Sequence, residues 1–492
     1  MSWLIYSLLL ILLSWFVLRK LSSENLNQWD YLIAFWVKIG FGVSYIIIFT
    51  YYFSDGTKIY GDTYRFLSDS QIINKIVYQD PIVFLKLVFG LGDLNTEEIQ
   101  LYLNQTQIWD YGNNGDWIND NRLILRLNII IHFFSLNNIY IHALIFSFIS
   151  FSGIHLIYKA FAPFISRRKL FWYTLILWPG IGFWGSGILK ESILVFGIGL
   201  WFYAIFKLLH QRYKTQHLIL LIVGGLTLIF NKPYAGLFII FSTLIYIIGY
   251  LTNWRKIGFI FSGAGLLISL IIVFNAPDNT NLTKKIAYKQ NALDNLGKGG
   301  ITFITDSSFC VFPYEKIENF SLIGKDHIKI NQSTDGSYKL FGKNEFKDFK
   351  LNPSSQIYEV YLVYPPSNSY FKTTKIDHVR TLLKTIPEAL VNVMIRPYPW
   401  DNGDRFKFIN FIFNIILIGL FCFALYFRSQ INKQTVYLLV TLFLTALFIA
   451  IIIGLTIPIF GALVRYKLPV ELCLILISFI LLKPKYENHS TL

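Results

Sequence analysis

The stretch WPGIGFWGSGILKES, residues 178–192, lies between two strongly apolar segments at 170–177 and 193–208. A proline and four glycines interrupt the helix that the first apolar segment would form. Lys190 and Glu191 then stand at a membrane edge, where charges are costly unless they have a use. We expect the next helix to begin near Ser186, so that its N-terminus and Lys190 can hold an anion such as a phosphate. The competing interpretation is a tight hairpin between two spans, in which Lys190 and Glu191 pair with each other.

The composition indicates an integral membrane protein with many spans. Of 492 residues, 54% are hydrophobic and only 15% are charged, and the mean hydropathy is +0.49. The net charge of +15 comes largely from short basic loops between apolar runs. Such loops set the orientation of a protein in the membrane, so we interpret the charge as topology and predict no nucleic-acid partner. Cys310, Cys422 and Cys473 have no metal-site spacing and support no disulfide framework. We predict no cofactor and no metal site.

The apolar segments predict an all-α polytopic protein of about 11 spans, once the segment 123–135 is taken as a helix lying at the membrane interface. In that segment Asn128, His132 and Ser135 share one face at helical spacing. The spans start near Trp3, Tyr31, Ile139, Leu170, Ile193, His217, Ala235, Ile257, Phe408, Val436 and Pro469. The short basic loops then fall on one side, which predicts an outward N-terminus. The richness in Ile, Asn, Lys and Phe is typical of a low-GC bacterium, so we expect the inner (cytoplasmic) membrane of a bacterium. If 123–135 crosses the membrane, the N-terminus moves inside and Asp62 becomes cytoplasmic.

Three parts follow from this topology. Residues 1–275 form an N-terminal membrane domain with an extracytoplasmic loop at 54–121 and the interfacial helix at 123–135. Residues 276–407 form a small extracytoplasmic α/β subdomain, and residues 408–492 form C-terminal membrane helices. Within the subdomain, alternation over 321–364 predicts short strands, with turns at Asp335-Gly336 and Asn352-Pro353, and 374–395 predicts an amphipathic helix.

Under this topology five distant segments bring charged residues to the outward face, which predicts a single outward-facing cavity. The five are the loop with Asp55 and Asp62, the turn 179–191, residues 231–234, the loop 276–407 and the turn 458–469. Asp62 is the first candidate for a general base, Asp55 is the second, and Glu191 can orient Lys190 or act on an acceptor. The candidate phosphate ligands are Lys190, Lys232, Arg396 and Arg465, and the candidate sugar-stacking rings are Tyr64, Trp184 and Tyr466. Arg396 can equally be an interfacial anchor, with Tyr398 and Trp400 in the aromatic belt.

These features resemble the GT-C class of polytopic membrane glycosyltransferases. The resemblance lies in an aspartate soon after an early span, an interfacial helix with an arginine, and an outward Pro-containing turn that ends in an acidic residue and a serine. The turn 179–191 is loosely similar to the luminal turn of the GPI mannosyltransferase branch. The stretches 183–191 and 396–400 are similar to bacterial surface-polysaccharide membrane proteins, including O-antigen polymerases. The chain departs from the GT-C pattern by an extra N-terminal span and by the lack of a paired acidic motif beside Asp62.

The resemblance covers residues 31–208 best and implies a function in cell-envelope polysaccharide or glycoconjugate synthesis. It implies a glycosyltransferase that takes a sugar from a polyprenyl-phosphate-linked donor to a saccharide or protein acceptor on the extracytoplasmic face, with Asp62 or Asp55 as the base. An O-antigen-type polymerase or ligase would depend more on Arg396 and Arg465. A lipid-linked saccharide transporter and a non-catalytic membrane subunit, which binds a partner protein through loop 276–407, are the remaining alternatives.

Overall fold

The structure is a computed structural model, and it describes most of residues 1–492. The residues outside its description are 22–25, 92–96, 104–105, 110–119, 211–213, 259, 261–262, 266–280, 305–307, 324–326, 341–346, 365 and 483–492. The described chain is mostly helical and divides into two compact units. The first unit contains residues 1–254, 421–445 and 471–492, and the second contains residues 255–420 and 446–470.

The helices have the length and apolar character of membrane spans. Among the described residues, seven helices are long and apolar enough to cross a membrane: α1 (Ser2–Lys20), α2 with its π-helical end η1 (Gln28–Tyr52), α7 with the 3₁₀ turn η2 (Ile139–Phe164), α9 (Lys190–His210), α11 (Pro233–Leu251), α15 (Phe406–Tyr426) and α16 (Lys433–Thr456). Two shorter apolar helices, α10 (Thr215–Asn231) and α18 (Leu468–Leu481), accompany them. The predicted span at Leu170 is a helix of only 10 residues, α8 (Arg168–Leu177). The predicted span from Ile257 falls largely outside the described residues.

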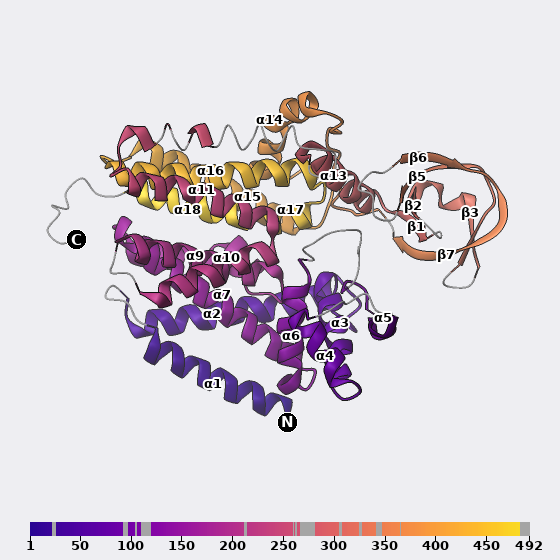
Figure 1. Cartoon of the computed structure of the whole chain (residues 1–492), viewed down its shortest axis with the longest axis horizontal. Helices are drawn as coiled ribbons and strands as arrows, with labels where there is room; N and C mark the ends of the chain where they lie inside the picture. Colours follow the sequence, from indigo (N-terminus) through magenta and orange to yellow (C-terminus); the bar gives the residue numbers. More distant parts are fainter. Residues whose placement is uncertain are drawn as a thin grey trace. The chain divides into compact units, whose positions relative to one another are not determined.

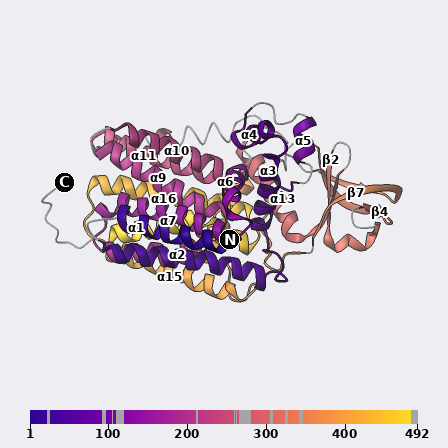
Figure 2. The same cartoon turned by 90° about the horizontal axis from the view of Figure 1, so that it is seen from below.

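In the first unit α7 lies between α2 and α9, and α10 packs against α9 (Figures 1 and 2). Small residues allow α7 and α9 to approach closely. A Cβ atom at Gly153 would lie 2.6 Å from the Cα atom of Phe196, and one at Gly199 would overlap the carbonyl oxygen of Gly153. Such small residues are common where membrane helices pack, because lipid offers no hydrophobic force that would hold the helices together.

Shorter helices cover one end of this bundle: α3 (Asp62–Ile76), α4 (Pro81–Phe89), α5 (Glu97–Leu103) and α6 (Arg122–Ser135) (Figure 1). Their apolar side chains, among them Ile73 and Leu125, form one buried cluster with Trp109 of the loop before α6. Asn128 and Ser135 of α6 both hydrogen-bond the buried His142 of α7, and the ring of His132 lies 4.5 Å from that of His142. The predicted common face of α6 is therefore confirmed.

The second unit contains a seven-stranded antiparallel sheet in the order β3-β4-β7-β1-β2-β5-β6 (Figure 1). Its strands are β1 (Gly300–Ile304), β2 (Ser308–Pro313), β3 (Phe320–Ile323), β4 (His327–Ile330), β5 (Thr334–Leu340), β6 (Lys347–Leu351) and β7 (Ser354–Tyr364), with the 3₁₀ segment η4 (Tyr314–Asn319) between β2 and β3. Alternate residues point inward, so Ile301, Phe303 and Phe312 lie in the core of the sheet.

The predicted strands are confirmed, although the sheet begins at Gly300 and not at 321. The predicted turn at Asn352-Pro353 joins β6 to β7, but the turn predicted at Asp335-Gly336 is wrong. Both residues lie inside β5, where Gly336 faces Phe312 so closely that a Cβ atom would come within 2.5 Å of its ring. The glycine at this position allows the close approach of the Phe312 ring and does not form a turn.

Helices complete the second unit: α13 (Leu282–Lys298), α14 (Val379–Ile395) and α17 (Phe460–Tyr466). Parts of α15, α16 and the α17–α18 segment also belong to it. The amphipathic helix predicted at 374–395 is α14, which begins five residues later than expected. Its Ala389 packs so tightly on α16 that a Cβ atom at Gly454 would overlap the Ala389 carbonyl.

Candidate functional site

The stretch 178–192 is a broken helical segment in the first unit. Helix α8 ends at Leu177, the π-helical segment η3 covers Gly180–Trp184, and α9 begins at Lys190. The predicted helix start near Ser186 is therefore wrong. The Ser186 hydroxyl donates to the carbonyl of Gly182 at 2.5 Å and its N–H donates to that of Phe183, so Ser186 closes the preceding turn and does not open the next helix.

Position 180 must be glycine, because the side chain of another residue approaches its backbone closely. The carboxylate of the buried Glu471 in α18 accepts a hydrogen bond from the indole N–H of Trp178 at 2.9 Å. A Cβ atom at position 180 would overlap that carboxylate. Glycine at this position therefore lets a side chain of α18 come close to the backbone.

Lys38, in the middle of α2, holds the broken segment from the other side. Its side chain is fully buried, and its ammonium donates to the carbonyls of Ile181 at 2.9 Å and Gly182 at 3.3 Å. Carbonyls at an interrupted helix lack their usual backbone partners, so a buried cation is a suitable donor. Sequence reasoning missed this role, because nothing in the sequence links position 38 to position 181.

Lys190 lies among three carboxylates at the start of α9. Its ammonium forms an ion pair of 2.7 Å with Asp120, and the charges of Asp62 and Glu191 also act on it. Asp62 is the first residue of α3 and follows Gly61, whose φ of +82° is a conformation that glycine adopts readily. The charge of Asp62 thus acts on Lys190, and the ion-pair partner of Lys190 is Asp120, which sequence reasoning missed.

Glu191 pairs with a different lysine. Its carboxylate lies 2.5 Å from the ammonium of Lys232, and both side chains are almost fully buried. Lys232 stands between α10 and α11, where Pro233 begins the second helix. The neighbouring Asn231 donates from its side chain to the carbonyl of Lys190 at 2.7 Å. The hairpin interpretation, in which Lys190 and Glu191 pair only with each other, is wrong because each has a partner from a distant segment.

Two hydrogen bonds hold the start of α3, one to the turn before α9 and one to α2. The Thr63 hydroxyl donates to the carbonyl of Ile188 at 3.2 Å and lies 2.9 Å from the hydroxyl of Tyr45. Tyr45 stacks on Phe49, and Trp184 meets both rings edge-on. The predicted stacking residue Trp184 therefore belongs to an aromatic group directly beside the charged residues.

Asp55 and Tyr64 have other local partners. Asp55 is exposed, and its hydrogen bonds in the described chain are all with Ser54 and Thr57, which hold the pKa of its carboxyl below the usual value. Tyr64 accepts a hydrogen bond of 3.3 Å from Lys58, whose ammonium also lies 5.1 Å from the ring centre. The structure does not bring Asp55 to Lys190.

Arg396, Arg465 and Tyr466 belong to the second unit. The Arg396 guanidinium lies 4.5 Å from the ring centre of Phe371, 5.2 Å from that of Tyr398, and 3.8 Å from the carboxylate of Asp401. Tyr398 stacks on the exposed Trp400, as an interfacial anchor would. The guanidinium of Arg465 donates to the hydroxyl of Tyr466 at 3.2 Å and lies 5.0 Å from the ring centre. A single cavity that joins all five segments stays a prediction.

The charged residues of the first unit, Asp62, Asp120, Lys190, Glu191 and Lys232, are called the α9 cluster below. It holds three carboxylates and two ammonium groups, so one carboxylate is in excess when all five are charged. A surplus carboxylate beside an ammonium can accept a proton without leaving a buried cation unpaired. The described residues contain no group of three or more His, Cys, Asp or Glu side chains that could hold a metal ion.

Comparison with known proteins adds no relative. No protein-family model, no curated protein and no solved structure matches the chain.

Proposed function

We propose that the chain is a membrane glycosyltransferase, which transfers a sugar from a polyprenyl-phosphate-linked donor to a saccharide or protein acceptor. In this proposal the enzyme lies in a bacterial inner membrane with about 11 spans, and its active face is extracytoplasmic. Helix α6 lies along the membrane surface, and the β1–β7 sheet stands outside the membrane. The product belongs to a cell-surface polysaccharide or glycoconjugate.

The observation that supports this proposal best is the position of Lys190 between carboxylates at the start of α9. Ionisable groups inside a membrane unit are expensive to bury and usually mark a functional site. Here they stand where three chain segments meet, at the helix starts of α3, α9 and α11. Backbone N–H groups at a helix start, together with Lys190, suit the phosphate of a lipid-linked donor.

The reaction follows from the charges of the α9 cluster. Asp62 takes the proton of the acceptor hydroxyl, the acceptor oxygen bonds to the anomeric carbon, and the bond from that carbon to the phosphate oxygen breaks. The phosphate leaves with the electron pair. When Asp62 becomes neutral, one of the carboxylates acting on Lys190 loses its charge, so more of the ammonium's field is available to the leaving phosphate. Proton transfer and leaving-group stabilisation are therefore coupled through Lys190.

The test compares aspartate variants of the purified full chain in proteoliposomes. The probes are radiolabelled polyprenyl-phosphate glucose, galactose and mannose, with water or simple glycosides as acceptors, and the readout is released polyprenyl phosphate. We expect Asp62→Asn to lower kcat by about 100-fold or more while donor affinity changes less than about twofold. Lys190→Gln should lower kcat and also raise the donor KM, since it removes the cation that binds the phosphate and stabilises it as it leaves.

Asp55→Asn is the matched control, because Asp55 is an aspartate in the loop just before α3 with hydrogen bonds only to its neighbours in the described chain. It should retain activity within about twofold. Full activity in Asp62→Asn would remove Asp62 from the role of base. Loss of activity in Asp120→Asn with Asp62→Asn active would assign the base to Asp120.

The second candidate function is an O-antigen-type polymerase or ligase. It is favoured by Arg396, whose guanidinium is surrounded by aromatic rings and keeps a side chain 23% exposed. An arginine held in this way can bind a phosphate with two parallel hydrogen bonds. If Arg396→Lys abolishes transfer while Asp62→Asn stays active, this second function is the better one.

A further inference from the structure

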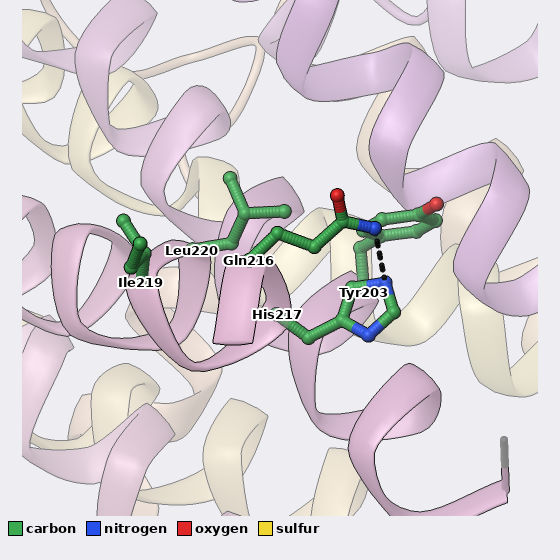
Figure 3. Close-up of a pocket in the computed structure, with 5 residues that line it drawn as sticks. All are labelled: Tyr203, Gln216, His217, Ile219 and Leu220. Atoms are coloured by element: carbon green, nitrogen blue, oxygen red, sulfur yellow. Dashed lines mark hydrogen bonds between the residues drawn. The ribbon is translucent and has the colours of Figure 1, made fainter. Parts of the chain in front are cut away.

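A pocket lies at the opposite end of α9 from the α9 cluster, beside the start of α10. It has a volume of about 350 Å³ and is lined by Tyr203, Gln216, His217, Ile219 and Leu220 (Figure 3). Tyr203 comes from the last part of α9, and the other four come from the first turns of α10. The pocket therefore stands where two apolar helices end and begin, at the edge of the membrane unit.

His217 provides a buried donor at this pocket. Only 5% of the residue is exposed, and its Nδ1 atom has no hydrogen-bond partner in the described chain. The amide nitrogen of Gln216 lies 3.4 Å from Nε2 (Figure 3). When Nε2 accepts a hydrogen bond from this amide, the proton of the neutral imidazole lies on Nδ1. A buried N–H without a partner is costly, and an oxygen of a bound ligand would satisfy it.

Lys207 lies beside a residue that lines the pocket, and two lysines from other helix ends act on it. Lys159 is in the last turn of α7, Lys207 is in the last turn of α9, and Lys214 directly precedes α10. The charges of Lys159 and Lys214 both act on Lys207 and repel its ammonium. The ammonium of Lys207 lies 5.5 Å from the ring centre of Tyr203, which lines the pocket.

The helix dipoles do not account for all three lysines. Lys159 and Lys207 stand at helix C-termini, where a positive charge is favourable, but Lys214 stands at the N-terminus of α10, where it is not. No side chain caps this N-terminus. Lysine charges, uncapped N–H groups and the Nδ1 donor of His217 together favour an anion with several oxygens.

An apolar stripe on α10 continues from the pocket. Ile219, Ile222, Val223, Leu226 and Phe230 follow one another at helical spacing, and each is between 43% and 55% exposed. The stripe spans about 16 Å at the rise of an α-helix, which is about half of the hydrocarbon thickness of a bilayer. That length fits one acyl chain of a lipid in a single leaflet.

We propose that the pocket binds an anionic phospholipid, whose headgroup phosphate contacts His217, Lys207 and Lys214 and whose acyl chain lies along the exposed stripe of α10. This lipid site is separate from the α9 cluster and independent of the proposed transfer reaction. By the predicted topology it belongs to the cytoplasmic leaflet, where anionic lipids are enriched.

The test uses the purified full chain in detergent and native mass spectrometry, with added phosphatidylglycerol, phosphatidylcholine or inorganic phosphate. We expect phosphatidylglycerol to bind and to raise the unfolding temperature, with weaker effects of the other two. Lys159→Gln/Lys214→Gln changes two exposed side chains and should therefore fold normally. It should weaken phosphatidylglycerol binding on the order of tenfold.

The matched control is Arg19→Gln/Lys20→Gln, which removes two exposed charges at the end of α1. Its affinity for phosphatidylglycerol should stay within about twofold of that of the unsubstituted chain. His217→Asn should weaken phosphatidylglycerol binding although all lysines are intact. Equal binding of phosphatidylcholine, or equal losses in the test and control variants, would overturn the proposal. An equal stabilisation by inorganic phosphate would show a free-anion site and would also overturn it.

Discussion

Glu191 and Lys232 form an ion pair that is almost fully removed from solvent. Taking two charges out of water costs several kcal/mol for each, and a buried pair recovers this only while both partners are present. The pair joins the start of α9 to the α10–α11 junction, so it fixes the backbone that also positions Lys190. At the residue scale, the ion pair therefore acts by fixing how the residues of the site are arranged.

A double-mutant cycle tests this coupling. Glu191→Gln and Lys232→Met should each lower the free energy of unfolding by about 3–5 kcal/mol, because each leaves one buried charge unpaired. The double variant should be more stable than the sum of the two losses predicts. The measurement is unfolding of the purified protein in detergent, and additive losses in the double variant would contradict a coupled pair.

At the scale of elements, α3 is tied to the loop that precedes α6 by one carboxylate. Asp69 is fully buried, and its oxygens accept hydrogen bonds from the backbone N–H groups of Gln107, Ile108 and Trp109 at 2.7–3.2 Å. Burial raises the pKa of the Asp69 carboxyl, against the effect of these donors. Since α3 carries Asp62 at its first residue, this attachment helps to hold the candidate base in place.

We expect Asp69→Ala to destabilise the protein by on the order of 3 kcal/mol, because three buried N–H groups lose their acceptor. Hydrogen–deuterium exchange at residues 107–109 should become faster by at least tenfold. Asp80→Ala is the control, since Asp80 caps α4 with two similar backbone hydrogen bonds and should cost only about 1 kcal/mol. Unchanged exchange at 107–109 in the Asp69 variant would show that this attachment does not hold the loop.

At the scale of the whole molecule, the predicted topology can be tested with single cysteines in a variant that lacks Cys310, Cys422 and Cys473. Cysteines at Asp55 and Lys350 should react with an impermeant maleimide in intact cells, because both positions are exposed and predicted to be extracytoplasmic. Cysteines at the exposed Lys20 and Arg167 should react only after the cells are permeabilised. A protected position 55 with a reactive position 20 would invert the orientation and move Asp62 to the cytoplasmic side.

The sequence by itself determined the class of the protein and its principal elements. Long apolar segments can satisfy their backbone only as helices in a membrane, so composition and hydropathy were enough to predict α1, α2, α7 and α9. Local chemistry also predicted the break at 178–185, because Pro179 and its glycines cannot continue α8, and the turn at Asn352-Pro353.

Only the tertiary structure decided the partners within the candidate site. Lys190 pairs with Asp120, Glu191 with Lys232, and Lys38 with carbonyls 143 and 144 residues away. Such contacts depend on how the helices pack. The residue pattern of one segment does not determine which distant segment it will contact. The same reason explains Gly336: a local pattern of Asp and Gly suggests a turn, while the close approach of Phe312 makes it part of a strand. Charge pairing across the bundle is therefore a property of the packed helices and of no single stretch.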